Sequence, residues 1–428
     1  MKKNIFIHIF KKQTSTKIAS YYLELYKDLI KKFKVKIYII YLEDKDINLD
    51  LKKQEELEKI WLEFLAFENI EEIKNFLNSI KENNIQIYTY YEELISLSNE
   101  LKKFLGQKIT EIDDLFISKK LQRENLLSFN KDITVNFLKF NDIEKVDKNL
   151  ILKNFNFPFI IKPSFWISSS WVVKINSEIE LEDNLNKLKE VFENLNKNRK
   201  IKNYEIIIEE FIDWKMYTID YFVWENNDLQ ISSLIRTKTL KDEYNIDDFW
   251  ITNEILWEKI EKEIDKKDLL DFLNQNIKAC KIKNTFVHHE FKLTSSWKLK
   301  TIELNWRIWW YRPEMYKKAY DLNLLEFLFN KNTKIEFKQY YQFIWLFPRK
   351  ETWKIFEWLN TSFIEQIKNL KSYFSYMIKE SFIGKKIWFT KNWYKYFWSI
   401  RLINKNFDEI EKDYIFIKEN LDKNIIYK

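Results

Sequence analysis

Two glutamates and an asparagine in the segment from Phe286 to Tyr311 have the spacing of a metal site. The segment reads FVHHEFKLTSSWKLKTIELNWRIWWY, and two alternating runs flank a three-residue connection, Ser295-Ser296-Trp297, which predicts a β-hairpin. Alternation places Glu290 of the first strand on the same face as Glu303 and Asn305 of the second. Hard oxygen ligands grouped in this way suit Mg²⁺, which prefers carboxylates together with phosphate oxygens. Taken alone, such a pair also fits a solvated face.

A second stretch, from Phe157 to Ile175, has the character of a phosphate-binding loop. It reads FPFIIKPSFWISSSWVVKI: a strand ends at Lys162, a small polar loop with Ser168, Ser169 and Ser170 follows, and a second strand begins. Backbone amides approach an anion closely only where no side chain intervenes, so the loop suits phosphate if Trp166 and Trp171 are glycine. Lys162 would then neutralise phosphate charge. With tryptophan at both positions, Lys162 would be an ordinary lysine at the end of a strand.

Glycine is scarce in this chain and tryptophan is abundant. The 428 residues include 2 glycines and 17 tryptophans, whereas the usual frequency of glycine would give about 30. Several tryptophans stand among turn-forming residues, and Trp297 occupies a hairpin position that usually has positive φ. We therefore hypothesise that many printed tryptophans are UGA codons of an organism that reads UGA as glycine. The alternative is a protein that is truly rich in tryptophan.

Composition limits the possible classes of protein. The 72 basic and 65 acidic residues are interspersed, so the net charge of +7 predicts a solvated surface and no nucleic-acid partner. Stacking of single-stranded nucleic acid on exposed tryptophans would need clustered basic charge. The lone cysteine, Cys280, excludes an internal disulfide. The N-terminal apolar run is too short for a signal peptide, and no stretch is long enough to span a bilayer, which predicts no membrane association and a cytoplasmic location.

The elements that must position these residues form three predicted units. The chain opens as βαβ, with strands at 4–10 and 35–42 and a helix at 17–33, followed by helical patterns at about 52–83, a strand at 85–90 and a helix to about 105. Near the C-terminus, strands at 341–347 and 393–403 enclose a helix at 361–375. The predicted domains are an N-terminal α/β domain at 1–115, a nucleotide and metal domain at 116–330, and a C-terminal α/β domain at 331–428.

The order of these motifs resembles the ATP-grasp superfamily. A lysine strand with a small polar loop, the strand and turn IIIEEFIDW, and the hairpin with its IELNWRIWW continuation follow one another over about residues 115–330. The tryptophans fall where that family uses glycine, at Trp166, Trp171, Trp214, Trp306, Trp309 and Trp310. The resemblance implies an α/β ATP-grasp fold with an N-terminal βαβ, Rossmann-like domain and a small C-terminal α/β domain.

The resemblance also implies roles for individual residues. Lys162 and Lys120 would contact the nucleotide phosphates together with the loop serines, and the segment bordering the adenine would comprise Glu209, Glu210, Phe211 and Ile212. Glu290, Glu303 and Asn305 match the metal ligands, Arg307 matches the arginine at the transferred phosphoryl group, and Arg312 would hold a substrate carboxylate. Met216 departs from the pattern, because many relatives have a ribose-binding glutamate there.

The implied activity is that of an ATP-dependent carboxylate-amine ligase that uses Mg²⁺, or Mn²⁺ in its place. It would join a small carboxylic acid to an amine through an acyl phosphate, and a homo-oligomer is compatible with the sequence. A catalytically inactive nucleotide-binding scaffold is the alternative. His289 is expected in the core, whereas His288, on the Glu290 face, suits either a substrate contact or a structural role.

Overall fold

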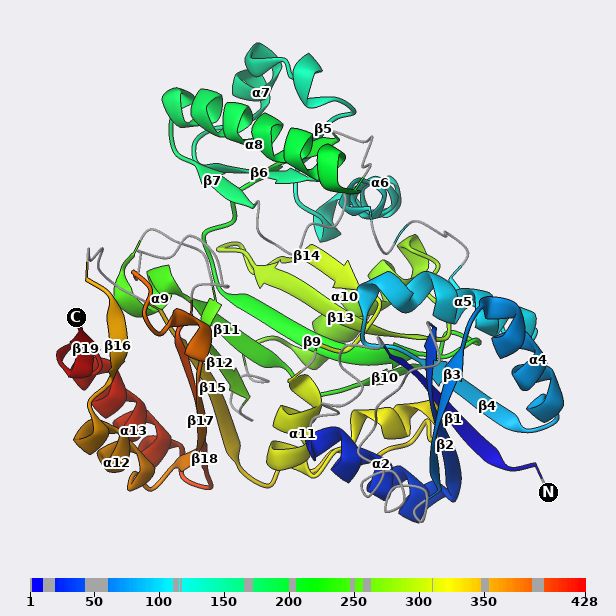
Figure 1. Ribbon diagram of the computed structural model, residues 1–428. Coiled ribbons are helices and arrows are strands. Elements are labelled where there is room, and N and C mark those ends of the chain that lie inside the picture. Colours follow the sequence, from blue (N-terminus) through cyan, green and yellow to red (C-terminus); the bar gives the residue numbers. More distant parts are fainter. Residues whose placement is uncertain are drawn as a thin grey trace.

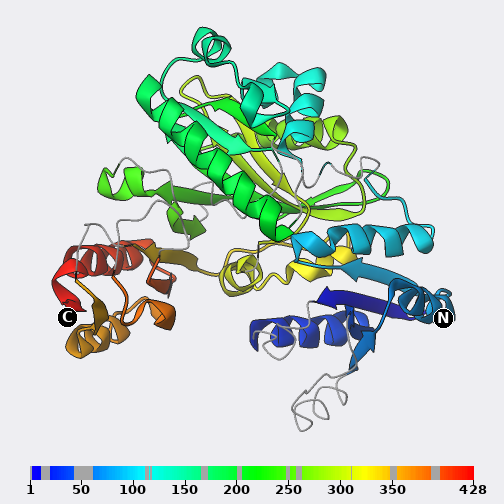
Figure 2. The same cartoon turned by 45° about the horizontal axis from the view of Figure 1, so that its top comes forward.

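The molecule consists of three lobes with the termini at opposite ends (Figures 1 and 2). The computed structural model describes residues 2–10, 20–42, 61–110, 115, 118–164, 172–199, 205–246, 251–256, 263–309, 311–347, 354–386 and 396–428. An N-terminal lobe (residues 4–104) and a small upper lobe (residues 137–210) lie against a broad sheet that continues into the C-terminal segment. Within these ranges, no helix combines the length and the apolar character needed to cross a bilayer.

The N-terminal lobe is a parallel sheet with strand order β3-β2-β1-β4, and it contains the predicted βαβ opening. The helical prediction for 52–83 is wrong at 62–67, which forms β3, because this apolar run pairs with β2 at the edge of the sheet. A helix begins only after Asn69, whose side chain caps it by accepting from the Glu72 amide. The elements are β1 (Asn4–Phe10), α2 (Ser20–Phe33), β2 (Val35–Leu42), β3 (Leu62–Phe67), α4 (Ile70–Ile80), β4 (Asn84–Tyr88) and α5 (Ile95–Phe104).

The upper lobe is an antiparallel sheet of order β5-β8-β6-β7 with helices packed on it. Alternate residues of β6 and β8 face a compact apolar cluster that also contains Leu181, Leu185 and Leu188 of the long helix α8. The elements of this part are α6 (Lys119–Phe129), β5 (Phe137–Phe140), α7 (Lys148–Asn154), β6 (Phe159–Pro163), β7 (Val173–Ile175), α8 (Glu178–Arg199) and β8 (Ile206–Glu210).

A nine-stranded antiparallel sheet forms the base, and it includes the C-terminal strands. Its order is β14-β13-β9-β11-β12-β15-β18-β17, with β10 paired to β9, so three C-terminal strands (β15, β17 and β18) extend the same sheet that carries the hairpin, whereas β16 and β19 pair with each other. The strands are β9 (Met216–Val223), β10 (Leu229–Ile231), β11 (Ile235–Thr239), β12 (Ile251–Leu256), β13 (Thr285–Leu293), β14 (Leu299–Asn305), β15 (Tyr340–Leu346), β17 (Tyr373–Ile378) and β18 (Trp398–Asn404). The remaining elements are α9 (Leu240–Tyr244), α10 (Lys266–Ala279), α11 (Arg312–Tyr320), β16 (Phe356–Leu359), α12 (Thr361–Lys368), α13 (Phe407–Asn420) and β19 (Ile425–Tyr427).

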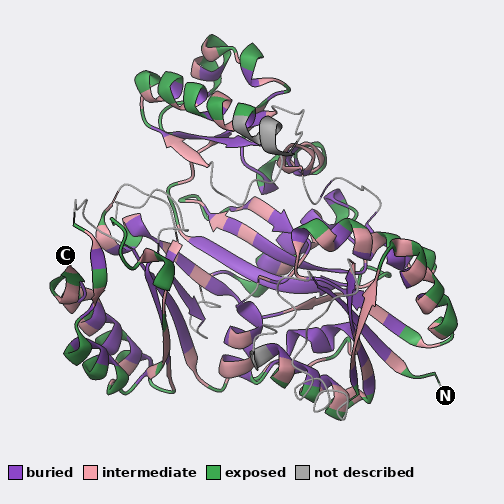
Figure 3. Cartoon of the chain, in the orientation of Figure 1, coloured by how far each residue is buried: buried purple, intermediate pink, exposed green. Residues whose placement is uncertain are grey.

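Strand β9 is buried along its whole length (Figure 3). Tyr217, Ile219 and Tyr221 face a core that includes α10, whereas Phe222 faces the core shared with α11. A strand covered on both sides is expected to be almost continuously apolar, so its polar residues, Thr218 and Asp220, are exceptions. Both have the side-chain direction of Phe222, and both are bonded to residues at the candidate site described below.

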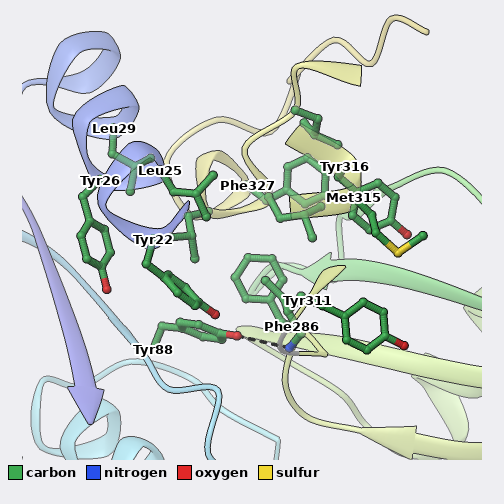
Figure 4. Close-up of a cluster of buried hydrophobic side chains, with 14 of the residues drawn as sticks. Tyr22, Leu25, Tyr26, Leu29, Tyr88, Phe286, Tyr311, Met315, Tyr316 and Phe327 are labelled. Carbon is green, nitrogen blue, oxygen red and sulfur yellow. Dashed lines mark hydrogen bonds between the residues drawn. The ribbon is translucent and has the colours of Figure 1, made fainter. Parts of the chain in front are cut away.

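An aromatic contact joins the N-terminal lobe to the base (Figure 4). The ring of Tyr88 lies edge-on to Phe286, with 5.3 Å between ring centroids. The hydroxyl of Tyr88 accepts a hydrogen bond of 3.2 Å from the amide of Ile308. The N-terminal lobe thereby fixes the backbone that follows the hairpin and carries Arg307.

Two tryptophans have a backbone conformation that normally belongs to glycine. Trp61 and Trp297 have φ values of 66° and 61°, close to the 73° and 75° of the two glycines, Gly106 and Gly384. The left-handed region is unfavourable for a bulky L-residue by about 1–2 kcal/mol. The side chains of Trp61 and Trp297 are 49% and 68% exposed, so little packing offsets this strain.

We predict that Trp297→Gly stabilises the printed protein by about 1 kcal/mol, because relief of the left-handed strain exceeds the loss of an exposed side chain. The matched change Trp398→Gly removes a fully buried side chain and should destabilise by at least about 3 kcal/mol. Denaturant unfolding of both variants measures the difference. A destabilising Trp297→Gly would show that the Trp297 side chain contributes more than its backbone costs.

Candidate active site

A cavity of about 190 Å³ lies between the upper lobe and the base. The upper lobe lines it with Lys162 and with the segment from Glu209 to Ile212, and the base lines it with Glu290 and Glu303. A concave site with convergent charged groups is the expected location of small-molecule binding. The cavity therefore brings together residues that the sequence places far apart.

The hairpin has the register predicted from the sequence. Glu290 pairs directly with Glu303, and His288 pairs with Asn305, across β13 and β14. The two carboxylates line the cavity, whereas Asn305 is 5% exposed and does not contribute to the cavity wall. Among the described residues, no group of three or more His, Cys, Asp or Glu has the arrangement of a metal site. Other possible ligands also line the cavity (Glu209, Glu210, Glu254 and His288), and Glu290 and Glu303 are the two that pair directly across neighbouring strands.

Glu303 is held by a lysine from helix α6. The Nζ atom of Lys119 lies 2.9 Å from Oε1 of Glu303. Burial by itself would raise the pKa of Glu303, but Lys119 and Lys162 outweigh it and hold that pKa below its usual range. Burial would likewise lower the pKa of Lys119, and Glu303 reverses this and raises it. Both groups therefore stay charged at neutral pH.

The other wall of the cavity contains a buried charge network. The carboxylate of Glu209 forms ion pairs with Nε of Arg123 and with Nζ of Lys162, each at 2.7 Å. Burial would raise the pKa of Glu209, but the two cations lower it, whereas burial lowers the pKa of Lys162 despite Glu209. Two cations share one carboxylate here, so the network has positive charge available for an anion.

Lys119, and not Lys120, faces the cavity. Lys120 pairs with Glu205 at 2.8 Å and donates to Asn141 on the outer side of the helix. The sequence prediction chose the neighbouring lysine, and one residue along a helix turns the side chain by about 100°. The carboxylate partner of Lys119 is Glu303, which is distant in the sequence, so the sequence around Lys119 does not reveal the pair.

The expected adenine-bordering segment is surrounded by lysines. Phe211 lies between Lys174 and Lys292, whose Nζ atoms are 4.8 Å and 5.0 Å from its ring centroid. Lys292 also donates to the carbonyl of Ile212 at 2.6 Å, and it pairs across the ladder with Met216. A lysine therefore lies beside the position where the sequence lacks the ribose-binding glutamate.

Glu210 and the two predicted arginines are engaged by the protein itself. Glu210 lines the cavity but accepts from Lys300 at 2.6 Å. Arg307 forms an ion pair with Glu92 of the N-terminal lobe, and its guanidinium lies over the ring of Trp309. Arg307 does not contribute to the cavity wall. Glu92 was missed because only the folded chain brings it to Arg307.

Arg312 is fully buried and does not line the cavity either, so the structure does not place it where it would hold a substrate carboxylate. Its Nη2 atom donates to Glu254 at 2.9 Å and to Thr218 at 2.8 Å. The expected arginine is thus a partner of Glu254, which does line the cavity. No motif pointed to Glu254, because its partner Arg312 is distant in the sequence.

The two histidines differ as expected from strand alternation. His289 is completely buried, and its Nε2 lies 3.0 Å from the hydroxyl of Thr301, which is the expected core position. His288 lines the cavity, with Nδ1 3.0 Å from Asp220 and Nε2 3.6 Å from Glu290. Asp220 therefore orients the His288 ring toward the carboxylate pair. The predicted loop residues Ser168, Ser169 and Ser170, together with Trp166, Trp171 and Trp310, lie outside the described residues.

Comparison with known proteins agrees with this geometry. Residues 155–308 match the sequence profile of the ATP-grasp domain family. A D-alanine–D-alanine ligase of Prochlorococcus marinus (strain MIT 9215) is 27% identical over 231 residues, which is 53% of this chain. The chain spans 59% of the length of that relative in this match.

Solved structures resemble the whole chain. The L-amino acid ligase of Bacillus licheniformis superposes with a TM-score of 0.67 and 16% identity, covering 100% of both chains. The N5-carboxyaminoimidazole synthetase of Staphylococcus aureus, solved with ADP, superposes with a TM-score of 0.61 and 14% sequence identity, and the match covers 99% of both chains. Likeness at these identities establishes the fold. The protein has the α/β ATP-grasp fold that the sequence motifs predicted.

The two adjacent lysines of α6 allow a direct test of the cavity. We predict that Lys119→Met weakens binding of Mg-ADP by at least about tenfold, because it removes a charged donor from the cavity wall. Lys120→Met should leave the affinity within about twofold, since its partner is a peripheral carboxylate. Isothermal titration calorimetry at fixed ionic strength measures both. The opposite ranking would restore Lys120 as the phosphate contact.

Proposed function

We propose that the protein is an ATP-dependent carboxylate-amine ligase that forms an amide through an acyl phosphate. One observation carries the proposal: Glu290 and Glu303 line one cavity together with the cations Lys119 and Lys162. Carboxylates suit a metal ion, and lysines suit phosphate oxygens. The match to the ATP-grasp domain family and the ligases among the relatives support the same reading.

The carboxylate pair fits a magnesium ion. Glu303 is held ionised by its neighbours, and the pairing of Glu290 with Glu303 places two hard oxygen donors side by side. Bound there, Mg²⁺ or Mn²⁺ would neutralise charge on the β- and γ-phosphates. Lys119 would then exchange Glu303 for a phosphate oxygen, because the metal takes over the carboxylate.

The proposed reaction proceeds in two steps, phosphoryl transfer and then amide formation. A carboxylate oxygen of the acid attacks the γ-phosphorus of ATP, the bond to the β-γ bridging oxygen breaks, and ADP leaves. The amine nitrogen then attacks the acyl carbon, inorganic phosphate leaves, and the nitrogen loses a proton. Lys162 and Lys119 stabilise charge on the transferring oxygens by fixed electrostatics. Arg307 would join them only after release from Glu92.

A catalytically inactive nucleotide-binding scaffold is the second candidate. The observation that favours it is the ion pair between Arg307 and Glu92, which keeps the expected transfer arginine out of the cavity wall. Such a scaffold would bind Mg-ATP through the same lysines. It would release no phosphate with any pair of acid and amine.

Phosphate release distinguishes the two candidates. We predict that the protein releases phosphate from Mg-ATP only with a carboxylic acid present, and that Glu303→Gln lowers this rate at least about 100-fold by removing a metal ligand. Glu357→Gln, at an exposed position of β16, is the matched control and should leave the rate unchanged. Nucleotide binding without phosphate release across panels of acids and amines would favour the scaffold. Full activity of Glu303→Gln would contradict the metal assignment.

We also propose that many printed tryptophans are glycine in the protein as its source makes it. The positive φ values of Trp61 and Trp297 support this, as does their exposure. Trp398 has no such signature, because it is completely buried in the C-terminal core. The proposal therefore concerns turn and loop positions.

Tandem mass spectrometry of the protein from its own source tests the recoding. We predict glycine at residues 166, 171 and 297, in peptides spanning 163–174 and 293–300. Expression in a host that reads UGA as tryptophan provides the reference spectrum. Tryptophan at these positions in the native protein would contradict the recoding and would favour the scaffold, since the phosphate loop would then be obstructed.

A further inference from the structure

Glu254 is a buried carboxylate in the cavity wall. It lies in β12, its side chain is 1% exposed, and it belongs to the cavity wall with Glu290 and His288. One oxygen accepts from Arg312 at 2.9 Å, and the other accepts from the hydroxyl of Tyr311 at 2.8 Å. Two hydrogen-bond donors on adjacent residues thus fix the orientation of the Glu254 carboxylate.

The carboxylate of Glu254 can still accept hydrogen bonds from a ligand. Each carboxylate oxygen has two acceptor positions, and the contacts from Arg312 and Tyr311 occupy one on each. Arg312 itself does not line the cavity, so Glu254 is the member of this pair that faces it. Burial raises the pKa of Glu254, and Arg312 and Tyr311 oppose that rise. Burial of a charged group is costly, and a carboxylate kept in a cavity wall in this way is typical of a functional site.

The cavity wall carries groups of both charges, and the lysines and Glu254 have different partners. Lys119 and Lys162 pair with Glu303 and Glu209, whereas the charged groups that act on Glu254 are Arg312, His288 and Glu290. A ligand with a negative end and a positive end would match this polarity. An amino acid has both charges within a few bonds.

We propose that Glu254 binds the ammonium group of the carboxylate substrate, so that the acid activated by this protein is an amino acid. The inference rests on the proposed ligase function, since it names the class of acid that enters the same cavity. The carboxylate of the amino acid points to the metal and phosphate end, and its ammonium donates to Glu254.

The geometry assigns Glu254 to the acid and not to the attacking amine. A nitrogen must be neutral to attack the acyl phosphate, and a carboxylate that binds an ammonium stabilises its protonated, unreactive form. The acid, in contrast, reacts through its carboxylate, so its ammonium can stay charged throughout. Binding through a group that does not react positions the acid without slowing its activation.

The inference is independent of the recoding. No tryptophan is among the three residues that define this subsite, which are Glu254, Arg312 and Tyr311. Glycine at Trp309 would enlarge the cavity beside this carboxylate, because Trp309 is part of the wall. The two donors that hold Glu254 would be unchanged.

Paired substrates with and without the ammonium test the assignment. Alanine is compared with propionate, and phenylalanine with 3-phenylpropionate, by phosphate release from Mg-ATP with a fixed amine such as hydroxylamine. We expect the wild-type protein to favour each amino acid by at least about tenfold in kcat/KM, as a charge-assisted hydrogen bond implies. Glu254→Gln should raise KM for the amino acids about tenfold and leave the KM for ATP unchanged.

Two further variants separate binding from folding. Glu326→Gln changes another buried glutamate, which pairs with Lys32 away from the cavity, and it should keep the preference for amino acids. Because Glu254→Gln leaves Arg312 buried without its partner, the double variant Glu254→Gln/Arg312→Met removes both charges. It too should lose the preference.

The outcomes distinguish this inference from the proposed function. Equal use of amino acids and their counterparts by the wild type, or a preference that survives in Glu254→Gln and in the double variant, would overturn the ammonium subsite and leave the ligase intact. Absence of phosphate release with every acid would overturn the ligase itself, and the subsite with it.

Discussion

The ion pair between Lys119 and Glu303 is the interaction on which the rest of the site depends. It joins helix α6 to the hairpin of the base across the cavity. Behind it, Glu209 is shared by Arg123 and Lys162. Uncompensated charge is costly in a buried setting, so these charged groups contact one another, although two cations share the single carboxylate of Glu209. Nucleotide and metal would replace these internal partners with their own charges, and binding is therefore an exchange of ion pairs.

The N-terminal lobe takes part in the site through two long-range contacts. Tyr88 holds the backbone at Ile308, and Glu92 holds the side chain of Arg307. Both contacts come from the end of β4 and the turn that follows it, at the carboxyl edge of a parallel sheet, where such sheets commonly place functional residues. A lobe that contributes no residue to the cavity wall thus holds Arg307, the arginine that the sequence motifs assign to the transferred phosphoryl group.

The sequence was sufficient to predict the features that depend on local patterns of residues. Alternation was sufficient for the pairing of Glu290 with Glu303, and motif order was sufficient for the ATP-grasp fold. The resemblance pointed to Lys120, whereas the neighbouring Lys119 lines the cavity, because the motif does not define which of two adjacent helix residues turns inward. The sequence could not find Glu254 or Glu92, whose partners are distant in sequence, and it took β3 for helix because strand pairing decides there.

Positional isotope exchange tests most directly whether the cavity activates a carboxylate by phosphorylation. ATP labelled with ¹⁸O in the β-γ bridge is incubated with the protein, Mg²⁺ and alanine, without any amine acceptor. Reversible formation of an acyl phosphate frees the β-phosphate of ADP to rotate, so we predict that the label scrambles into non-bridging positions. Label that stays in the bridge, although ATP binds, would contradict activation by phosphorylation.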